Sequence, residues 1–274
     1  MADDDLRDFD RSEFTHDGKT RTIFRIGDGP AVIVIAEMPG ITPKVLAFAR
    51  RVAAIGCTAV LPHLFGTPGR DVNPAAHGLP RAATDFASSF VPTCVSREFV
   101  VLATGKTSPV VRWLRALAAE EHARCGGPGV GAIGMCFTGG YALAMATDER
   151  LLAPVLAEPS MPLPVTPSRR RSIDISRADL EVVKNRCASQ GLQVLGLRFK
   201  GDRAVPPERF AFLRAELGDA FVAVELDDAA ANPDSPFPPH SVVTEHLIDE
   251  PGQPTREALD QVLELFRSRL LTAV

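Results

Sequence analysis

A cysteine in a glycine-rich turn is the residue of this chain best suited to covalent chemistry. Cys136 follows an uncharged apolar run, Val130 to Ile133, and precedes a small-residue segment, Tyr141 to Ala146. The first segment has the length and type of a buried strand, and the second suits a buried helix. A helix N-terminus behind a cysteine favours the thiolate through its dipole and its free N–H groups. We therefore predict a thiol nucleophile at this turn; a buried, inert structural cysteine is the alternative.

An acid and a histidine follow the cysteine in the chain and can complete its chemistry. Asp202 comes after the apolar run 192–199, which predicts a strand, and His240 ends a loop rich in Asp, Ala and Pro. Such a histidine removes the thiol proton and later protonates the leaving group, while the acid orients the imidazole ring. The N–H of Phe137, next to the nucleophile, would bind the developing oxyanion. The predicted triad is therefore Cys136, His240 and Asp202.

A second histidine competes with His240 for the role of general base. His246 lies within the apolar segment 242–248, whereas His240 lies at the end of a polar loop. Catalytic residues occur on loops more often than within buried apolar segments. We therefore predict that His240 is the base and that His246 packs in the interior.

A carboxylate also follows the first predicted central strand. Residues 31–36 are all apolar, which is typical of a buried strand, and Glu37 comes directly after them. In an open α/β sheet, ligands bind beyond the carboxyl ends of the strands. Glu37 is therefore well placed to reach a site there, although the residue type alone fits an ordinary loop carboxylate equally well.

Strands and helices alternate along the rest of the chain. A hairpin is predicted over residues 13–26, and the strand 152–157 ends at Glu158-Pro159-Ser160, near the expected edge of the site. Residues 62–92 are rich in Pro and Gly and lack periodicity, and a loop of this length typically covers a functional site. The other predicted elements are helices 43–55, 96–102, 109–122, 176–188 and 255–271 and strands 57–61 and 221–226.

Length and composition predict one large folded domain. The chain has 274 residues, of which 45% are hydrophobic and 23% charged, so a sizeable core is available. Alternating strands and helices favour an α/β fold with a mostly parallel central sheet and helices on both faces. The acidic residues 1–11 are predicted to be a flexible tail, and residues 12–274 a single domain.

Charge and spacing patterns argue against several other classes of function. The net charge is −4 and no basic stripe is present, so binding to nucleic acid or to a membrane surface is not expected. Without a run of about 18 apolar residues or an N-terminal signal core, we expect a soluble, cytoplasmic protein. The five cysteines form no C-x-x-C pair and the six histidines lack metal-ligand spacing. Neither a disulfide framework nor a metal or other cofactor is therefore predicted.

Together these residues resemble the dienelactone hydrolase (carboxymethylenebutenolidase) family. The resemblance covers about residues 30–270 and rests on the order of four features: Glu37, the Gly-x-Cys-x-x-Gly-Gly turn around Cys136, Gly201-Asp202 and His240-Ser241. It implies an α/β-hydrolase fold, in which the nucleophile stands at a sharp strand-to-helix elbow. This chain departs from the family at Thr138, where the family usually has a glycine.

The resemblance also implies an activity and further site residues. It implies a carboxylic ester hydrolase that acts on small esters or lactones through a thioester intermediate and needs no cofactor. Glu37 would modulate the resting thiol, and the N–H of Met38 would join that of Phe137 in the oxyanion hole. Arg97 corresponds to a family arginine that binds an anionic substrate, but it is equally compatible with a solvated ion pair. Where the family has an arginine after the catalytic histidine, this chain has Thr244.

Two other classes of function are compatible with the sequence. One is a non-catalytic protein with the hydrolase fold that binds a ligand or a partner, since a fold does not prove a function. The other is a thiol redox sensor, which is less favoured because no resolving cysteine lies near Cys136 in the sequence.

Overall fold

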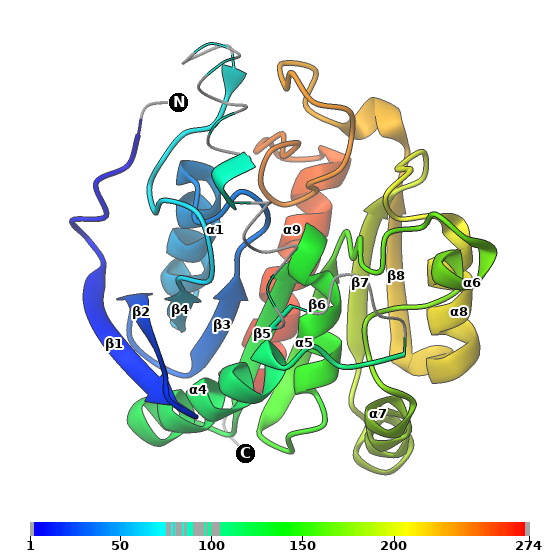
Figure 1. The fold of residues 1–274 in the computed structure, drawn as a ribbon, viewed down its shortest axis with the longest axis horizontal. Coiled ribbons are helices and arrows are strands. Elements are labelled where there is room, and N and C mark those ends of the chain that lie inside the picture. The colour runs from blue at the N-terminus through cyan, green and yellow to red at the C-terminus, as the bar shows by residue number, and fades with distance from the viewer. Residues whose placement is uncertain are drawn as a thin grey trace.

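Eight strands of the computed structural model pair into one sheet in the order β1-β2-β4-β3-β5-β6-β7-β8 (Figure 1). The structure describes residues 3–74, 78, 80, 84, 87–89, 96, 98, 99 and 105–271. β2 pairs antiparallel with β1 and β4, and all other neighbouring strands are parallel, as the sequence predicts. The strands are β1 Asp10–His16, β2 Lys19–Ile26, β3 Ala31–Ile35, β4 Thr58–Pro62, β5 Val130–Met135, β6 Leu151–Ala157, β7 Val194–Phe199 and β8 Phe221–Leu226.

Helices cover both faces of this sheet, which confirms the predicted α/β architecture. α1 and α9 pack on one face, and α4, α5, α7 and α8 pack on the other (Figure 1). The helices are α1 Pro43–Ala54, α4 Val110–Cys125, α5 Gly139–Met145, α6 Pro167–Arg170, α7 Arg177–Gln190, α8 Pro207–Leu217 and α9 Pro254–Leu270.

Strand β3 contributes to two separate cores, one on each face of the sheet. Val32 and Val34 belong to the apolar cluster formed with α1 and α9, whereas Ile33 and Ile35 belong to the cluster formed with α4 and α5. Successive side chains of a strand point to opposite faces, so a strand covered on both faces needs apolar residues throughout. This requirement explains why all of residues 31–35 are buried and apolar.

Two sequence predictions fall partly outside the described residues. Of the predicted helix 96–102, only residues 96, 98 and 99 are described, and Glu98 and Phe99 lie in a turn. Of the predicted loop 62–92, the described part up to residue 73 contains no helix or strand beyond the end of β4, but residues 74, 80, 84 and 87–89 are helical and so differ from the prediction.

The acidic N-terminal segment is bound to the domain. The Arg50 guanidinium of α1 donates to Asp4 at 2.7 Å and to Asp8 at 2.6 Å. The backbone N–H of Asp4 donates to the carbonyl of Gly69 at 2.8 Å, and β1 already begins at Asp10. Residues 3–11 therefore do not form the free tail that the sequence predicts, because their acidic side chains pair with an arginine that is distant in the sequence.

A buried arginine holds the segment that follows β6. Arg209 of α8 is 0% exposed and donates to four backbone carbonyls of this segment. A guanidinium has five N–H donors in a fixed planar arrangement, so one side chain can satisfy several carbonyls that no strand or helix pairs. The four acceptors and their distances are Pro159 at 2.6 Å, Pro162 at 2.5 Å, Arg169 at 3.1 Å and Ser172 at 2.8 Å.

A second buried polar residue lies against the first turn of α5. Asp174 is 7% exposed, and a Cβ added to Gly140 would lie 1.7 Å from its Oδ1 atom, so that position requires glycine. Burial raises the pKa of the Asp174 carboxyl to about 8, against the lowering effects of its own backbone N–H and of the Arg209 charge. Asp174 is therefore mostly protonated in the folded protein below that pH.

Replacing Asp174 by Asn is expected to remove a pH dependence of the free energy of unfolding. Because the pKa of about 8 in the folded protein lies above the ordinary value of 3.8, ionisation opposes folding, and stability falls as the pH rises between these two values. One such group contributes a slope of up to about 1.4 kcal/mol per pH unit. Urea unfolding of the wild type and of Asp174→Asn at a series of pH values measures the difference between their free energies of unfolding. As the pH rises, this difference should shift in favour of Asp174→Asn. Parallel stability curves would contradict the buried protonated carboxyl.

Candidate active site

The predicted nucleophile sits in a backbone conformation that few residues adopt. Cys136 lies between β5 and α5, at the first position of a short 3-10 turn, Cys136–Thr138, and its φ is +52°. A positive φ costs free energy for a residue with a Cβ atom and persists only where the surroundings fix it. The N–H of Ser160 donates to the Cys136 carbonyl at 3.0 Å and helps to fix it. The cysteine is half-buried, so its sulfur is held at the end of the strand rather than within the core.

Thr138 joins this elbow to the neighbouring strand. Its hydroxyl accepts from the N–H of Met135 at 3.0 Å and donates to the carbonyl of Ile35, at the end of β3, at 2.9 Å. The close approach is possible because residue 134 is glycine: an added Cβ there would lie 2.1 Å from the Thr138 carbonyl oxygen. The threonine that departs from the family pattern therefore serves as a polar link between β5 and β3.

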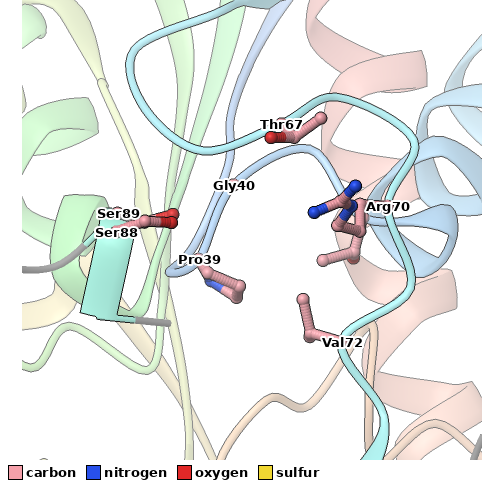
Figure 2. A pocket seen from close by; sticks show the side chains of 8 residues that line it. Pro39, Gly40, Thr67, Arg70, Val72, Ser88 and Ser89 are labelled. Carbon is pink, nitrogen blue, oxygen red and sulfur yellow. The ribbon is translucent and has the colours of Figure 1, made fainter. Parts of the chain in front are cut away.

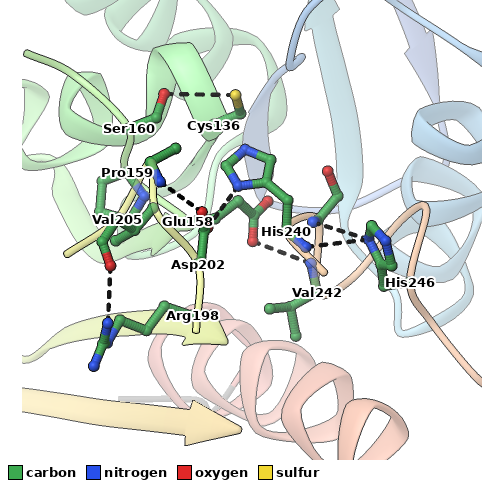
Figure 3. Close-up of polar contacts among 12 residues, drawn as sticks. Cys136, Glu158, Pro159, Ser160, Arg198, Asp202, Val205, His240, Val242 and His246 are labelled. Atoms are coloured by element: carbon green, nitrogen blue, oxygen red, sulfur yellow. Dashed lines mark hydrogen bonds and ion pairs between the residues drawn. The ribbon is translucent and has the colours of Figure 1, made fainter. Parts of the chain in front are cut away.

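The structure brings the predicted histidine and acid together. His240 Nδ1 lies 2.6 Å from Asp202 Oδ2, and the other oxygen of Asp202 accepts from the N–H of Ala204 at 2.8 Å. The imidazole ring lies between Asp202 and Cys136 (Figure 3). Burial alone would lower the pKa of His240, but the charge of Cys136 and hydrogen bonds with Asp202 and Cys136 raise that pKa well above its usual value. The arrangement therefore favours a protonated imidazole beside the sulfur.

Glu37 faces the segment that carries His240. It is 7% exposed, so it is not the ordinary solvated loop carboxylate that the sequence leaves open. One carboxylate oxygen accepts from the hydroxyl of Ser241 and the other from the hydroxyl of Thr244. These contacts hold residues 240–244, which we call the histidine segment, against the end of β3. A direct effect of Glu37 on the thiol stays a prediction.

The rival histidine contacts backbone atoms of the same segment. His246 is 1% exposed, and its Nδ1 accepts from the N–H of Ser241 at 3.2 Å and from the N–H of His240 at 3.4 Å. Because Nδ1 accepts, its Nε2 carries the proton and donates to the carbonyl of Phe237 at 3.1 Å. Its ring therefore supports the histidine segment, while the imidazole of His240 is the one directed toward Cys136 (Figure 3).

The other predicted site residues differ in how far the structure describes them. Met38 lies three residues beyond the carboxyl end of β3, next to Glu37, and Phe137 is buried directly after Cys136. Arg97 lies outside the described residues. Its neighbour Glu98, which the sequence offers as an ion-pair partner for it, accepts from Arg21 at 2.6 Å.

Sequence reasoning assigned no role to the turn that follows β6. The hydroxyl of Ser160 lies 3.5 Å from the sulfur of Cys136, and a carboxylate oxygen of Glu158 accepts from the N–H of Val242 at 3.1 Å. The available signal is the one that pointed to Glu37, namely a carboxylate directly after a buried strand. We call residues 158–160 the β6 turn.

Two hollows lie beside the loops that form the site, and neither is lined by Cys136. The first is bordered by the loop after β3, with Arg70 facing Pro39 across it (Figure 2), and its volume of about 10 Å³ suits one water molecule. The second has a volume of about 380 Å³ and lies between α1 and the histidine segment. Its lining includes Lys44, Arg51, Asn73, Asn232 and Thr244.

Neither a metal cluster nor a spanning helix is found in the part of the chain that the structure describes. Within that part, no three or more His, Cys, Asp or Glu side chains gather in a way that could hold a metal ion. No helix there is both long and apolar enough to cross a membrane.

Comparisons with known proteins point to one family. The family model described as "Dienelactone hydrolase family" matches residues 23–175. A dienelactone hydrolase-like promiscuous phosphotriesterase, P91, from metagenomic libraries is 17% identical, with a TM-score of 0.61, over 96% of this chain and 98% of that one. The dienelactone hydrolase of Anabaena variabilis ATCC 29413 is 14% identical, with a TM-score of 0.57, over 96% and 100%. At such identities the two structures establish the fold alone. No curated protein matches the chain.

Replacing Thr138 by Val is expected to destabilise the elbow more than replacing it by Ser. Valine keeps the shape but removes the hydroxyl, which leaves the buried N–H of Met135 and the carbonyl of Ile35 without that partner. Such a loss costs about 1–3 kcal/mol, whereas loss of the methyl group in Thr138→Ser costs about 1 kcal/mol. Urea unfolding measures both variants. Equal stability of the valine and serine variants would show that the hydroxyl does not join the strands.

Proposed function

The chain belongs to the dienelactone hydrolase family, and we propose that it is a cysteine-dependent hydrolase of small esters or lactones. The observation that carries the proposal is the His240 ring, which lies between Asp202, at 2.6 Å, and the half-buried Cys136. This is the order of groups that nucleophilic acyl transfer requires: a nucleophile, a base that exchanges its proton, and an acid that orients the base.

In the first half of the proposed reaction, the sulfur of Cys136 attacks the ester carbonyl carbon. The carbonyl π electrons move to oxygen, and the N–H groups of Met38 and Phe137 bind the resulting oxyanion. One such donor is worth about 10²–10³ in rate. When the carbon–oxygen bond breaks, the imidazolium of His240 gives its proton to the departing alkoxide, leaving a thioester on Cys136. The raised pKa of His240 supports this step, because such a ring stays protonated until the alkoxide departs and accepts the proton.

In the second half, water hydrolyses the thioester. Neutral His240 takes a proton from the water as it attacks the acyl carbon, and the same two N–H groups bind the oxyanion again. Collapse of this intermediate breaks the carbon–sulfur bond, releases the carboxylic acid and restores the sulfur beside the imidazolium. Asp202 stabilises the imidazolium whenever it forms and does not itself take the proton.

The proposed substrate class includes carboxylated lactones only if Arg97 binds the substrate. Thr244 stands where the resembled family has an arginine, and its hydroxyl donates to Glu37. A threonine engaged in this way does not supply the bidentate, charge-assisted contact that a guanidinium gives a carboxylate. We therefore keep Arg97 as the proposed substrate-binding cation and propose small neutral esters and lactones as substrates that need no such contact.

Cys136→Ala is expected to abolish the hydrolysis of activated esters such as p-nitrophenyl acetate. His240→Ala should lower kcat by about 10³-fold or more, and the double variant should lose little beyond the single cysteine change, because triad members act as a unit. Steady-state turnover of the four proteins measures these losses.

Cys187→Ala provides a matched control, because Cys187 is also a half-buried free cysteine but lies on α7. It should retain wild-type turnover. Wild-type turnover in Cys136→Ala would remove the enzyme proposal. A wild-type protein that is inactive toward a panel of esters and lactones, with its fold intact, would support the non-catalytic binding alternative.

We also propose that Glu37 modulates the resting thiol. A carboxylate near a thiol disfavours the thiolate by like-charge repulsion. Glu37 is buried and follows β3, the strand adjacent to the one that ends at Cys136, which supports this role. Its hydroxyl contacts with Ser241 and Thr244 fix the carboxylate in place.

Glu37→Gln is therefore expected to move the pH at which iodoacetamide alkylates Cys136 half-maximally to a lower value. The amide removes the negative charge but keeps the size of the side chain. Ser241→Ala and Thr244→Val are matched controls, because each removes one contact of Glu37 and keeps its charge; their profiles should not move in this direction. An alkylation profile of Glu37→Gln that coincides with that of the wild type would restrict Glu37 to holding the histidine segment.

A further inference from the structure

One carboxyl group beside the site has no part in the reaction described above. Glu158, at the end of β6, is 0% exposed and has a φ of +38°. One oxygen accepts from the N–H of Val242 at 3.1 Å, and the other has no hydrogen-bond partner among the described residues. A buried polar atom without a partner costs free energy, so its presence at this position calls for a reason.

The groups around Glu158 come from every strand end that forms the site. Glu37 follows β3, Cys136 follows β5, and His240 lies in the segment after β8, with Asp202 of the β7 end beyond it. Burial raises the pKa of Glu158 well above its usual value, and the charges of Glu37 and Cys136 raise it further against the opposing charge of His240. Burial among these groups therefore favours the protonated form of Glu158.

Glu158 and Glu37 hold the same segment from opposite sides. β3 and β6 are the two neighbours of β5 in the sheet. From the β3 side, Glu37 accepts from the hydroxyls of Ser241 and Thr244. From the β6 side, Glu158 accepts from the N–H of Val242 (Figure 3). The histidine segment is thereby attached on both sides of the strand that ends at the nucleophile.

The β6 turn also contacts the nucleophile directly. The N–H of Ser160 donates to the carbonyl of Cys136, and its hydroxyl lies 3.5 Å from the sulfur. Pro159 packs on the first residue of α5 so closely that a Cβ on Gly139 would lie 2.4 Å from the Pro159 Cα atom. Arg209 holds the carbonyl of Pro159 from the other side. A three-residue turn thus touches both the cysteine elbow and the histidine segment.

We propose that Glu158 is a positioning residue that works as a neutral carboxylic acid and fixes the histidine segment relative to the cysteine elbow. The inference rests on the proposed function of Cys136 and His240. A neutral carboxyl accepts from the Val242 N–H without adding a charge next to Glu37 and the sulfur. An ionised carboxylate would repel both and would hold the proton of His240 more tightly, which slows protonation of the leaving group.

Glu158→Gln and Glu158→Leu separate the neutral contact from the charge. The glutamine amide oxygen can accept from Val242 and is uncharged, so kcat for p-nitrophenyl acetate at pH 7 should stay within about threefold of the wild type. Leucine removes the acceptor, and kcat should fall about 10-fold or more with KM nearly unchanged, as expected for the loss of one buried hydrogen bond. In the wild type, kcat should also decline as rising pH ionises Glu158, and Glu158→Gln should lack that decline.

Three readouts make the outcome decisive. The proposal that Glu158 acts as a neutral acid is overturned if Glu158→Gln is as impaired as Glu158→Leu at pH 7, or if it keeps the decline of kcat with rising pH that the wild type shows. The proposed positioning role is overturned if Glu158→Leu turns over like the wild type. Circular dichroism and urea unfolding identify a leucine variant that fails to fold, in which case the glutamine pH profile decides. The NMR titration of the His240 imidazole is a readout that needs no turnover. In the wild type, the chemical shifts of the ring should change a second time as Glu158 ionises, and this step should be missing in Glu158→Gln. An inactive wild type that shows this step would refute the esterase proposal and leave the coupling of Glu158 to His240 intact.

Discussion

Cys136 holds a φ of +52° so that its sulfur stands at the end of β5, and the neighbouring chain must offset the cost of that conformation. The surroundings do so with three kinds of contact. Thr138 ties the elbow to β3 through its hydroxyl, Ser160 binds the Cys136 carbonyl, and the glycine at position 134 allows the strand and the turn to approach closely. Since each contact comes from a different strand, the conformation of one residue depends on the order of the strands in the sheet.

The strand order also explains how three carboxyl groups lie near one imidazole with different partners. Asp202 binds the ring of His240, Glu37 binds two hydroxyls, and Glu158 binds a backbone N–H. A negative charge close to a buried carboxyl group opposes the ionisation of that group. Burial and the charges of Glu37 and Cys136 raise the pKa of Glu158. They outweigh the opposing charge of His240 and favour the protonated form of this carboxyl. The hydrogen-bond partners, rather than the residue types, thus distinguish the acid of the proposed triad from the two residues that hold the histidine segment.

The rest of the fold serves this edge of the sheet at longer range. Arg209, from α8, donates to carbonyls of the β6 turn and of the segment that follows it. Asp174 packs against the first turn of α5. A fold shared with proteins of 14–17% identity tolerates extensive substitution in its helices and strands. The polar residues that reach between elements leave less room for change, because each satisfies groups that no strand or helix pairs.

The sequence by itself determined the elements and their order. Apolar runs such as residues 31–35, the glycines around Cys136 and the alternation of strands and helices depend on local periodicity, which a single chain displays directly. The order of Cys136, Asp202 and His240 along the chain likewise indicated the proposed triad. None of these inferences required knowledge of which residues touch.

Tertiary structure alone decided the contacts between residues far apart in the chain. It gave His240 a partner 38 residues away in Asp202, and it directed the ring of His246 to backbone atoms nearby. It gave Glu37 a partner 207 residues away in Thr244, attached the acidic N-terminus to Arg50, and placed Glu158 under the histidine segment. A carboxylate has the same charge and size in any of these settings, so its residue type does not reveal its partner. Its partner, its burial and hence its protonation are fixed only when the strands have packed side by side.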